Sequence, residues 1–226
     1  MPVTADEELA WLHGPPLRGF QGTFADAPSM RPRRQQLKSP EELSAGMPIS
    51  GKKVAILVEN LYEDLEFWYP YYRLKEEGAE LTVVGTGSAP LYKGKHGLEA
   101  KPDITADQAD PARFDAVVIP GGYAPDYMRR YPALIRLVKE AHAQGKVVAA
   151  ICHAGWVLAS AGLTKGLTMT CFSSIKEDVM NAGASYVDEA VVKDRNIITS
   201  RFPADLPAFC REIISSLEAK APADVR

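Results

Sequence analysis

The amino-acid sequence predicts an α/β protein, with a doubly wound, mostly parallel central sheet and helices on both faces. Runs of branched apolar residues alternate along the chain with stretches long enough for helices. The runs are continuously apolar, as expected of strands that are covered on both faces of a parallel sheet. The first two runs, 54–58 and 81–84, lie about 25 residues apart, which fits a βαβ unit.

The expected elements follow one another in a regular order. Gly78, Gly162 and Gly183 end expected helices, because glycine readily adopts the left-handed conformation that follows a helix. A turn at 194–196 separates two short apolar runs and predicts a hairpin. The expected strands cover residues 54–58, 81–84, 115–120, 146–151, 167–171, 191–192 and 197–199. The expected helices cover residues 63–77, 132–144, 156–161, 174–181 and 203–219, and a small hairpin is expected within 85–105.

The first 50 residues differ from the rest, and we expect them to form an irregular N-terminal arm beside a domain of residues 51–226. Frequent prolines leave room only for short helices, near 6–12 and 40–45. The arm also holds large apolar side chains, too many to leave in water, so we expect it to pack on the domain or on a neighbouring subunit. These side chains are Trp11, Leu12, Leu17, Phe20 and Phe24.

Composition argues against several classes of protein. The chain has a net charge of −3 and a pI near 5.9. A net negative charge gives no attraction to nucleic acid or to an anionic membrane, so we do not expect either as a partner. No apolar run approaches the ~20 residues of a membrane span, and the acidic N-terminus is unlike a signal peptide. Three cysteines without C-x-x-C spacing argue against disulfides and zinc. We therefore expect a cytoplasmic protein with no metal and no other cofactor.

One expected strand ends in a cysteine. The apolar run 147–151 stops at Cys152 and His153, and a helix follows at once. This is the arrangement of a nucleophile elbow, in which a sharp turn presents one side chain above the sheet. The turn and the helix N-terminus behind it are expected to lower the pKa of the thiol and to expose a thiolate. The alternative is a buried core cysteine, the commoner state of a free thiol.

Two further strand ends carry groups suited to chemistry. Residues 59–66 follow the first strand and 121–126 follow the third. In such a sheet, ligands bind outside the carboxyl ends of the strands, so these segments are expected to meet the cysteine. Gly122 has no Cβ and can bring its N–H close; with the N–H of His153 it would form an oxyanion hole for an attack by Cys152. The alternative role of the glycine pair is a tight turn.

Two carboxyl groups are expected beside the thiol. Glu63 and Glu66 lie three residues apart near a helix start, hence on one face of the helix. Burial and a negative neighbour raise the pKa of a carboxyl group, so one of the two can donate a hydrogen bond to the thiolate. The alternative is that acidic residues are simply favoured at helix N-termini, and for Glu59 and Asp64 we keep that reading.

Several motifs between residue 52 and about 218 occur in the order known from one family. They include Tyr-Glu-Asp-Leu-Glu at 62–66, Pro-Gly-Gly-Tyr-Ala-Pro-Asp at 120–126, Ala-Ile-Cys-His-Ala-Gly at 150–155 and Ile-Lys-Glu-Asp at 175–178. With these motifs the sequence resembles the PfpI family of class I glutamine amidotransferase-like proteins. The resemblance implies a flavodoxin-like sandwich and a homo-oligomer, built of dimers that can assemble into hexamers.

The resemblance also implies roles for individual residues. It makes Cys152 the nucleophile, His153 its base partner and Glu66 the acid that contacts the thiol, with Glu63 close to it. The acid that orients the histidine comes from a neighbouring subunit, at the position of Asp126. Glutamate is usual at this position, and the aspartate is one methylene shorter, which reduces its reach.

Three residues are expected to line a substrate pocket. Lys95 and His96 lie in a loop bounded by glycines, beside the expected hairpin. Phe172 stands where some relatives of the PfpI family have a tyrosine in the pocket, and Leu98 is a similar departure. Residues 154–156 likewise replace a common Gly-Pro. The resemblance therefore implies a retained catalytic core with altered substrate contacts.

Three functions agree with these residues. The preferred hypothesis is a stress-protective enzyme that acts on small reactive carbonyl compounds such as methylglyoxal, like a glutathione-independent glyoxalase or a protein deglycase. The second is an intracellular cysteine peptidase, the activity for which the family is named. The third is a non-enzymatic redox sensor, in which Cys152 is oxidised to a sulfinic acid that Glu66 binds.

Overall fold

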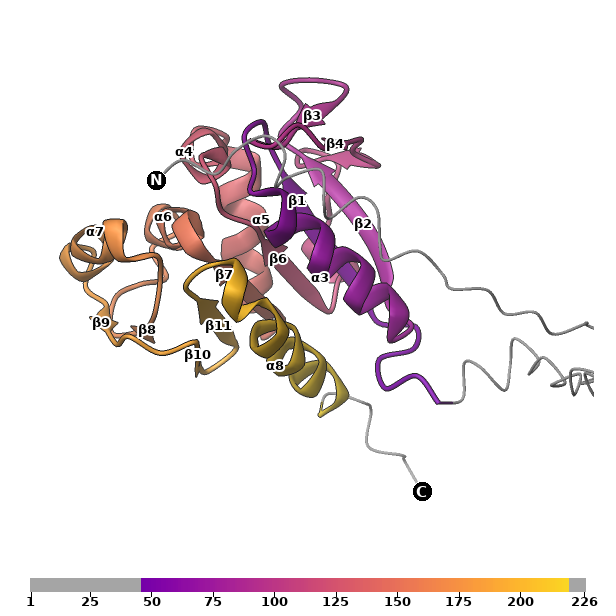
Figure 1. Ribbon diagram of the computed structural model, residues 1–226. Helices are drawn as coiled ribbons and strands as arrows, with labels where there is room; N and C mark the ends of the chain where they lie inside the picture. The colour runs from indigo at the N-terminus through magenta and orange to yellow at the C-terminus, as the bar shows by residue number, and fades with distance from the viewer. Residues whose placement is uncertain (1–45, 220–226) are drawn as a thin grey trace, which may run out of the picture. The chain divides into compact units, whose positions relative to one another are not determined.

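The computed structural model describes residues 46–219, which form a seven-stranded sheet with helices on both faces (Figure 1). Its strands are β1 (Lys53–Val58), β2 (Glu80–Gly85), β5 (Ile104–Thr105), β6 (Ala116–Ile119), β7 (Val147–Ile151), β10 (Val191–Asp194) and β11 (Ile197–Ser200). Their order is β10-β11-β7-β6-β1-β2-β5, and all neighbours are parallel except β10 and β11, which form the expected hairpin. The predicted fold class is confirmed.

Two groups of helices cover the sheet. The helices are α3 (Asp64–Glu76), α4 (Ala124–Met128), α5 (Pro132–Ala143), α6 (Gly155–Ser160), α7 (Lys176–Asn181) and α8 (Leu206–Glu218). In Figure 1, α3 and α8 lie side by side on one face, while α4, α5 and α6 lie on the other. The five helices expected between residues 63 and 219 are all present. The sequence did not predict α4, because a helix of this length has no clear hydrophobic period.

The core of the protein lies along the middle strands. Every residue of β6 and β7 is buried, and in β1 only the first residue is exposed. Helices on both faces explain why these runs are continuously apolar. Because β7 lies between β6 and β11, the residue after it reaches the carboxyl edge of the sheet well away from either end.

Two small sheets accompany the central one. β3 (Tyr92–Lys93) and β4 (Glu99–Ala100) form the hairpin expected within 85–105. β8 (Thr168–Met169) pairs with β9 (Ser185–Tyr186) outside the central sheet, so the strand expected at 167–171 is shorter than predicted. The N–H groups of Thr168 and Thr170 donate to the side chains of Asp194 in β10 and Thr199 in β11, at 2.8 and 3.0 Å.

The expected N-terminal arm lies almost entirely outside the described residues. Its last part, 46–50, consists mostly of turns, in which the Ile49 side chain is fully buried. The packing of the arm and its short helices at 6–12 and 40–45 fall outside the described range and stay predictions. Within residues 46–219, none of the helices has the length and apolar character needed to cross a membrane.

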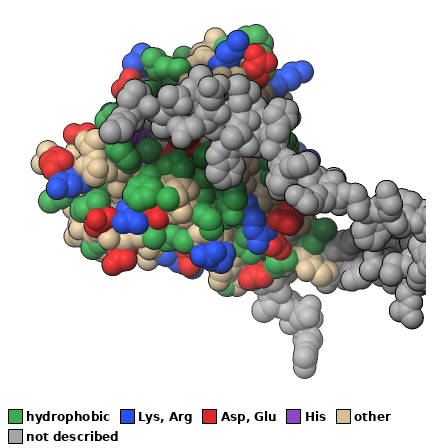
Figure 2. All heavy atoms as spheres, viewed as in Figure 1, with side chains coloured by type: hydrophobic (Ala, Val, Ile, Leu, Met, Phe, Trp, Pro, Cys, Tyr) green, Lys and Arg blue, Asp and Glu red, His purple; other side chains and the backbone are tan. Residues whose placement is uncertain are grey.

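Helix α3 exposes apolar side chains to solvent. Leu65 and Tyr72 are 56% and 60% exposed, and Tyr69 is exposed as well. The face of the molecule drawn in Figure 2 carries a broad area of hydrophobic side chains bordered by charged ones. Among residues 46–219, apolar side chains of α3 are thus left exposed to solvent.

Candidate active site

The turn between β7 and α6 has the geometry of a nucleophile elbow. Cys152 follows β7 directly with a φ of 62°, in a 3-10 turn of Cys152–Ala154 that continues into α6. A positive φ is uncommon for a residue with a side chain and costs about 1–3 kcal/mol, which the surrounding structure must supply. Ile175 and Val179 lie so near Gly155 that a Cβ there would meet them at 3.1 Å. This close packing helps to fix the turn.

The elbow brings two neighbouring side chains face to face. The Cys152 Sγ atom lies 3.1 Å from Nδ1 of His153, so the adjacent residues form the contact that sequence analysis required. On the other side of the ring, Nε2 lies 3.1 Å from the Ser174 hydroxyl. The ring also stacks on Phe172, with centroids 5.1 Å apart, and meets the edge of Trp156 at 5.2 Å. The predicted pocket residue Phe172 therefore contacts the catalytic candidates.

Glu66 lies beside the thiol and is completely buried. Its Oε2 atom accepts a hydrogen bond of 2.9 Å from the N–H of Gly121, while Oε1 has no hydrogen-bond partner among the described residues. Burial first, and then the charge of Glu63, raise the pKa of this carboxyl group to about 8, and the group interacts with the Cys152 thiol. At neutral pH Glu66 is therefore mainly protonated, as the sequence analysis required of an acid that donates to sulfur.

The expected lowering of the thiol pKa is wrong. Cys152 is only 6% exposed, and burial together with the negative charge of Glu66 raises its pKa to about 12. The helix behind the elbow does not offset this burial, because the elbow turns the side chain into the protein instead of into solvent. Activation of the thiol then requires a base within reach. Burial and the charge of Lys95 lower the pKa of His153, so its imidazole is neutral at pH 7 and can accept the proton.

The glycine pair allows the site to be compact. A Cβ on Gly121 would lie 2.6 Å from Cβ of Cys152 and 2.7 Å from Oε2 of Glu66, so any side chain would separate the thiol from the carboxyl group. Gly122 has a φ of 75°, and a Cβ there would lie 2.5 Å from the Leu61 carbonyl oxygen. The N–H groups of Gly122 and His153, the two predicted oxyanion donors, lower the pKa of the Cys152 thiol, but by less than burial raises it.

Glu63 and the hairpin complete the near surroundings. The Glu63 side chain caps α3 by accepting the N–H of Glu66 at 2.9 Å, and its Oε1 lies 3.8 Å from Nε2 of His96. The buried Asp64 carboxylate accepts the N–H groups of His96 and Leu98, both at 2.9 Å. Asp64 thus holds the loop that carries Lys95 and His96 in place. The sequence alone predicts Asp64 only as an acidic residue favoured at a helix N-terminus.

Asp126 does not contact His153 within one chain. Its carboxylate instead pairs with Arg130, which lies in the turn just after α4, at 2.6 Å, and both side chains are about half exposed. Whether Asp126 reaches the histidine of a second subunit stays a prediction. The residue that does contact Nε2 of His153 is Ser174, which the sequence analysis missed because a serine after Phe172 belongs to no motif.

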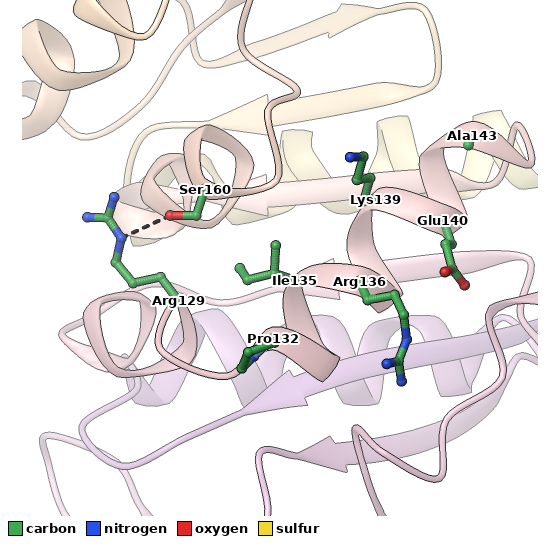
Figure 3. Close-up of a pocket in the computed structure, with 8 residues that line it drawn as sticks. All are labelled: Arg129, Pro132, Ile135, Arg136, Lys139, Glu140, Ala143 and Ser160. Atoms are coloured by element: carbon green, nitrogen blue, oxygen red, sulfur yellow. Dashed lines mark hydrogen bonds between the residues drawn. The ribbon is translucent and has the colours of Figure 1, made fainter.

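The hollow in Figure 3 is a separate feature. It has a volume of about 620 Å³ and is lined by residues of α5, the end of α6 and Arg129, whose side chain donates to the Ser160 hydroxyl at 3.0 Å. None of the predicted site residues lines it. In the described part of the chain, no cluster of three or more His, Cys, Asp or Glu side chains is arranged to bind a metal ion.

Comparison with known sequences identifies relatives of this region. The model of the DJ-1/PfpI family matches residues 52–216. Deglycase PH1704 of Pyrococcus horikoshii is 43% identical over 166 residues, which are 74% of this chain and 99% of the relative. Deglycase PfpI of Pyrococcus furiosus is 41% identical over the same length and the same shares.

Solved structures have the same fold. A two-domain protein of Anabaena variabilis, which contains DJ-1/ThiJ/PfpI-like and ferritin-like domains, is 48% identical with a TM-score of 0.72; the match covers 76% of this chain and 52% of the other. Drosophila melanogaster DJ-1beta is 32% identical with a TM-score of 0.70, and the match covers 75% of this chain and 92% of the other. The chain therefore spans about half the length of the two-domain protein.

Proposed function

Because the chain belongs to the DJ-1/PfpI family, we propose that it is a cysteine-dependent enzyme of the deglycase type, which acts on small reactive carbonyl compounds and protects the cell under stress. The names of the relatives support an enzyme of this kind. The observation that carries the proposal is the strained Cys152, whose sulfur lies 3.1 Å from Nδ1 of His153 beside a buried, protonated carboxyl group.

With methylglyoxal as substrate, the first step is addition of sulfur to the aldehyde carbon. The thiol proton passes to Nδ1 of His153 as the S–C bond forms, and the N–H groups of Gly122 and His153 stabilise the oxyanion. Protonation of that oxygen gives a hemithioacetal. Cys152 remains protonated until this step because of its high pKa, so the attack depends on the base.

The second part of the reaction moves protons and adds water. A proton leaves the former aldehyde carbon and another joins the neighbouring carbon, which converts the hemithioacetal into a thioester of lactate. Glu66 and His153 are the groups that exchange these protons. Water then cleaves the thioester, releases lactate and restores the thiol, so the sum is methylglyoxal plus water giving lactate.

Burial of the nucleophile favours small substrates over peptides. Cys152 is only 6% exposed, and Phe172 and Trp156 flank the His153 ring beside it. A folded polypeptide needs an open groove to bring its backbone to the sulfur, whereas an aldehyde of a few atoms does not. For this reason we place the cysteine peptidase second.

We also propose that the enzyme works as a homo-oligomer in which Asp126 of one subunit approaches the site of another. The apolar side chains exposed on α3, Leu65 and Tyr72 among them, support association with a second copy. Sedimentation of the full chain tests the assembly, and we expect a dimer or a larger even-numbered oligomer. A monomer at micromolar concentration would contradict this part of the proposal.

The test of the activity is lactate formation from methylglyoxal by the full-length chain. Cys152→Ser should lower kcat at least about a thousandfold, because the nucleophile is lost while the fold is kept. Cys210→Ser is the matched control, since Cys210 is a buried thiol in α8 with no part in the site, and it should retain activity.

Other outcomes would select the rival functions. Peptide hydrolysis that depends on Cys152, without turnover of methylglyoxal, would establish a peptidase in place of the proposed enzyme. A chain inert towards both substrates, in which peroxide oxidises Cys152 before Cys171 and Cys210, would identify a redox sensor.

A further inference from the structure

We propose that the Lys95 side chain binds an anionic group of the substrate, so that the site prefers reactive carbonyl compounds that carry a carboxylate or a phosphate group. This inference rests on the proposed function and names the class of carbonyl compound that the same site takes. It is drawn from the way the loop of Lys95 is held, from the reach of its charge, and from the partners of the acidic groups around it.

Hydrogen bonds hold the loop of Lys95 at the carboxyl edge of the sheet. The N–H of Lys95 donates to the carbonyl oxygen of Tyr62 at 2.9 Å, and Tyr62 forms a β-bridge with Gly122, one of the two predicted oxyanion donors. A Cβ on Gly94 would lie 2.5 Å from the carboxyl group of Asp64, so the loop packs directly on the start of α3. The backbone of Lys95 is therefore held beside the segment that supplies an oxyanion donor.

The positive charge of Lys95 acts on both groups that are proposed to move protons. Burial and the charge of Glu63 raise the pKa of Glu66, and the charge of Lys95 opposes this rise. Burial first, and then the charge of Lys95, lower the pKa of His153. Charges act on one another noticeably only within about a Debye length, roughly 8–10 Å in physiological salt. The flexible side chain of Lys95 can therefore reach a small substrate that is bound to Cys152 between these two groups.

The acidic groups nearest to Lys95 have other partners. Glu63 faces His96 and accepts a backbone N–H of α3, and Asp64 accepts the N–H groups of His96 and Leu98. Among residues 46–219, no ion pair neutralises the ammonium group of Lys95, whereas the neighbouring lysine of the hairpin has one. An anionic ligand can therefore bind to Lys95 without displacing an ion pair of the chain.

Lys95 is also the one cation, in the part of the chain that the structure describes, that acts on the reacting groups. The other groups that shift the pKa values of the thiol, the imidazole and Glu66 are carboxyl groups, the thiol itself and backbone N–H groups. The rings of Phe172 and Trp156 flank His153 and carry no charge. Selection between anionic and neutral substrates at this site thus depends on Lys95, because hydrogen bonds between charged groups are about twice as strong as neutral ones.

Glyoxylate is a suitable probe, because it combines an aldehyde with a carboxylate. The Cys152 sulfur adds to the aldehyde carbon, the thiol proton reaches the new oxygen through His153, and a hemithioacetal results. The adjacent carbon is already a carboxylate and cannot accept the second proton of the proposed mechanism, so the reaction stops at this point. Glyoxylate should therefore inhibit the turnover of methylglyoxal competitively. Glyoxylamide has the same shape without the charge, and glycolaldehyde phosphate with glycolaldehyde gives the corresponding pair for a phosphate group.

The experiment measures, for the full chain, the ratio of the inhibition constant of the neutral ligand to that of the anionic ligand. Lys95→Met keeps the length of the side chain but removes its charge, so this ratio should fall about tenfold for at least one of the two pairs. Lys95→Arg keeps the charge and should retain most of the ratio. Lys93→Met is the matched control, because Lys93 lies on the same hairpin but pairs with Glu99 at 3.3 Å, and it should leave the ratio unchanged.

The inference is overturned if Lys95→Met leaves the ratio unchanged for both pairs of ligands while methylglyoxal is turned over, and the proposed function then stands without the preference for anions. If methylglyoxal is not turned over, dissociation constants from calorimetry replace the inhibition constants. A ratio that falls in Lys95→Met would then support binding of the anion by Lys95 although the proposed function fails. No binding of either anionic ligand at millimolar concentration would overturn the inference as well.

Discussion

Two buried glutamates lie near the carboxyl edge of the sheet, and their surroundings are opposite. Glu59 follows β1 and is 3% exposed. Its Oε1 atom accepts hydrogen bonds from the backbone and side-chain N–H groups of Asn60, at 2.7 and 3.1 Å. Its Oε2 atom accepts hydrogen bonds from the hydroxyl groups of Thr86 and Ser88. Glu66 is fully buried, and among residues 46–219 its one backbone donor is the N–H of Gly121; it faces a second acid and a thiol.

The difference separates structural carboxyl groups from reactive ones. Hydrogen bonds to both oxygens compensate the burial of Glu59 and connect β1 to the loop after β2, so this group stabilises the edge of the sheet. Glu66 lacks this compensation, and burial raises its pKa to about 8. A carboxyl group that is protonated near neutral pH can donate and accept protons during turnover. The exposure of the two residues is nearly the same, so their hydrogen-bond partners decide their roles.

Of the substitutions that test the contrast between the two glutamates, Glu66→Gln is expected to have the largest effect. The amide keeps the shape of the side chain and can still accept the N–H of Gly121, but it cannot transfer a proton, so kcat should fall about a hundredfold or more. Steady-state kinetics with methylglyoxal measure the loss. Glu59→Gln is the matched control, and a loss of kcat of the same size there would contradict the contrast between the two glutamates.

The pH dependence of stability is the next largest effect. The pKa of Glu66 is about 8 in the folded protein, against a reference value of 4.5. Between these values the unfolded chain loses a proton that the folded chain retains, so the free energy of unfolding falls by about 1.4 kcal/mol per pH unit from this group. Its contribution is complete below pH 4.5 and is lost as the pH rises through 8. Urea unfolding from pH 5 to 8 measures the slope.

Glu66→Gln should remove this slope, because glutamine does not titrate. The variant is then expected to gain stability relative to the unmodified protein as the pH rises. If the free energy of unfolding changes with pH equally in the two proteins between pH 5 and 8, Glu66 is ionised in the folded state and the prediction is wrong.

A smaller loss of stability is expected from Glu59→Gln. The amide nitrogen cannot accept the hydroxyl hydrogen bonds of Thr86 and Ser88, so the free energy of unfolding should fall by about 1–3 kcal/mol. The midpoint of urea unfolding at pH 7 gives the change. The kcat of the folded fraction should stay within about twofold of the unmodified value.

The smallest effect on stability is expected from Asp126→Ala. The pair with Arg130 is about half exposed on both sides and contributes below about 1 kcal/mol. The effect of Asp126→Ala on kcat tests whether Asp126 is the residue that orients His153. A clear loss of kcat at unchanged stability would support an acid from a neighbouring subunit, whereas unchanged kcat would leave Ser174 as the partner of His153.

The sequence was sufficient for the features that depend on local patterns. Continuous apolar runs located β1, β6 and β7, and the break at Cys152 located the elbow, because a strand that turns at once into a helix leaves few backbone conformations for the residue between them. The convergence of Glu66, Gly121 and Cys152 followed from the rule that parallel strands present their carboxyl ends at one edge.

Features that depend on the depth of burial could not be predicted in this way. The elbow suggested a lowered thiol pKa, but the pKa depends on how far Cys152 is removed from water, and that is decided by residues distant in sequence, such as Glu66 and Gly121. Ser174 was missed for a related reason. Its contact with His153 arises from the path of the chain between β8 and α7, where no hydrophobic period or motif constrains the sequence.

The two parts of the site differ in how they are attached to the protein. The nucleophile follows β7, which is hydrogen-bonded on both sides within the central sheet, whereas Lys95 and His96 lie on the hairpin of β3 and β4, a two-stranded sheet of its own. Amide hydrogens of β7 should exchange with solvent only through global unfolding, and those of the hairpin through local opening, many orders of magnitude faster. The hairpin can then open to admit and release small molecules many times during the lifetime of a single folded sheet.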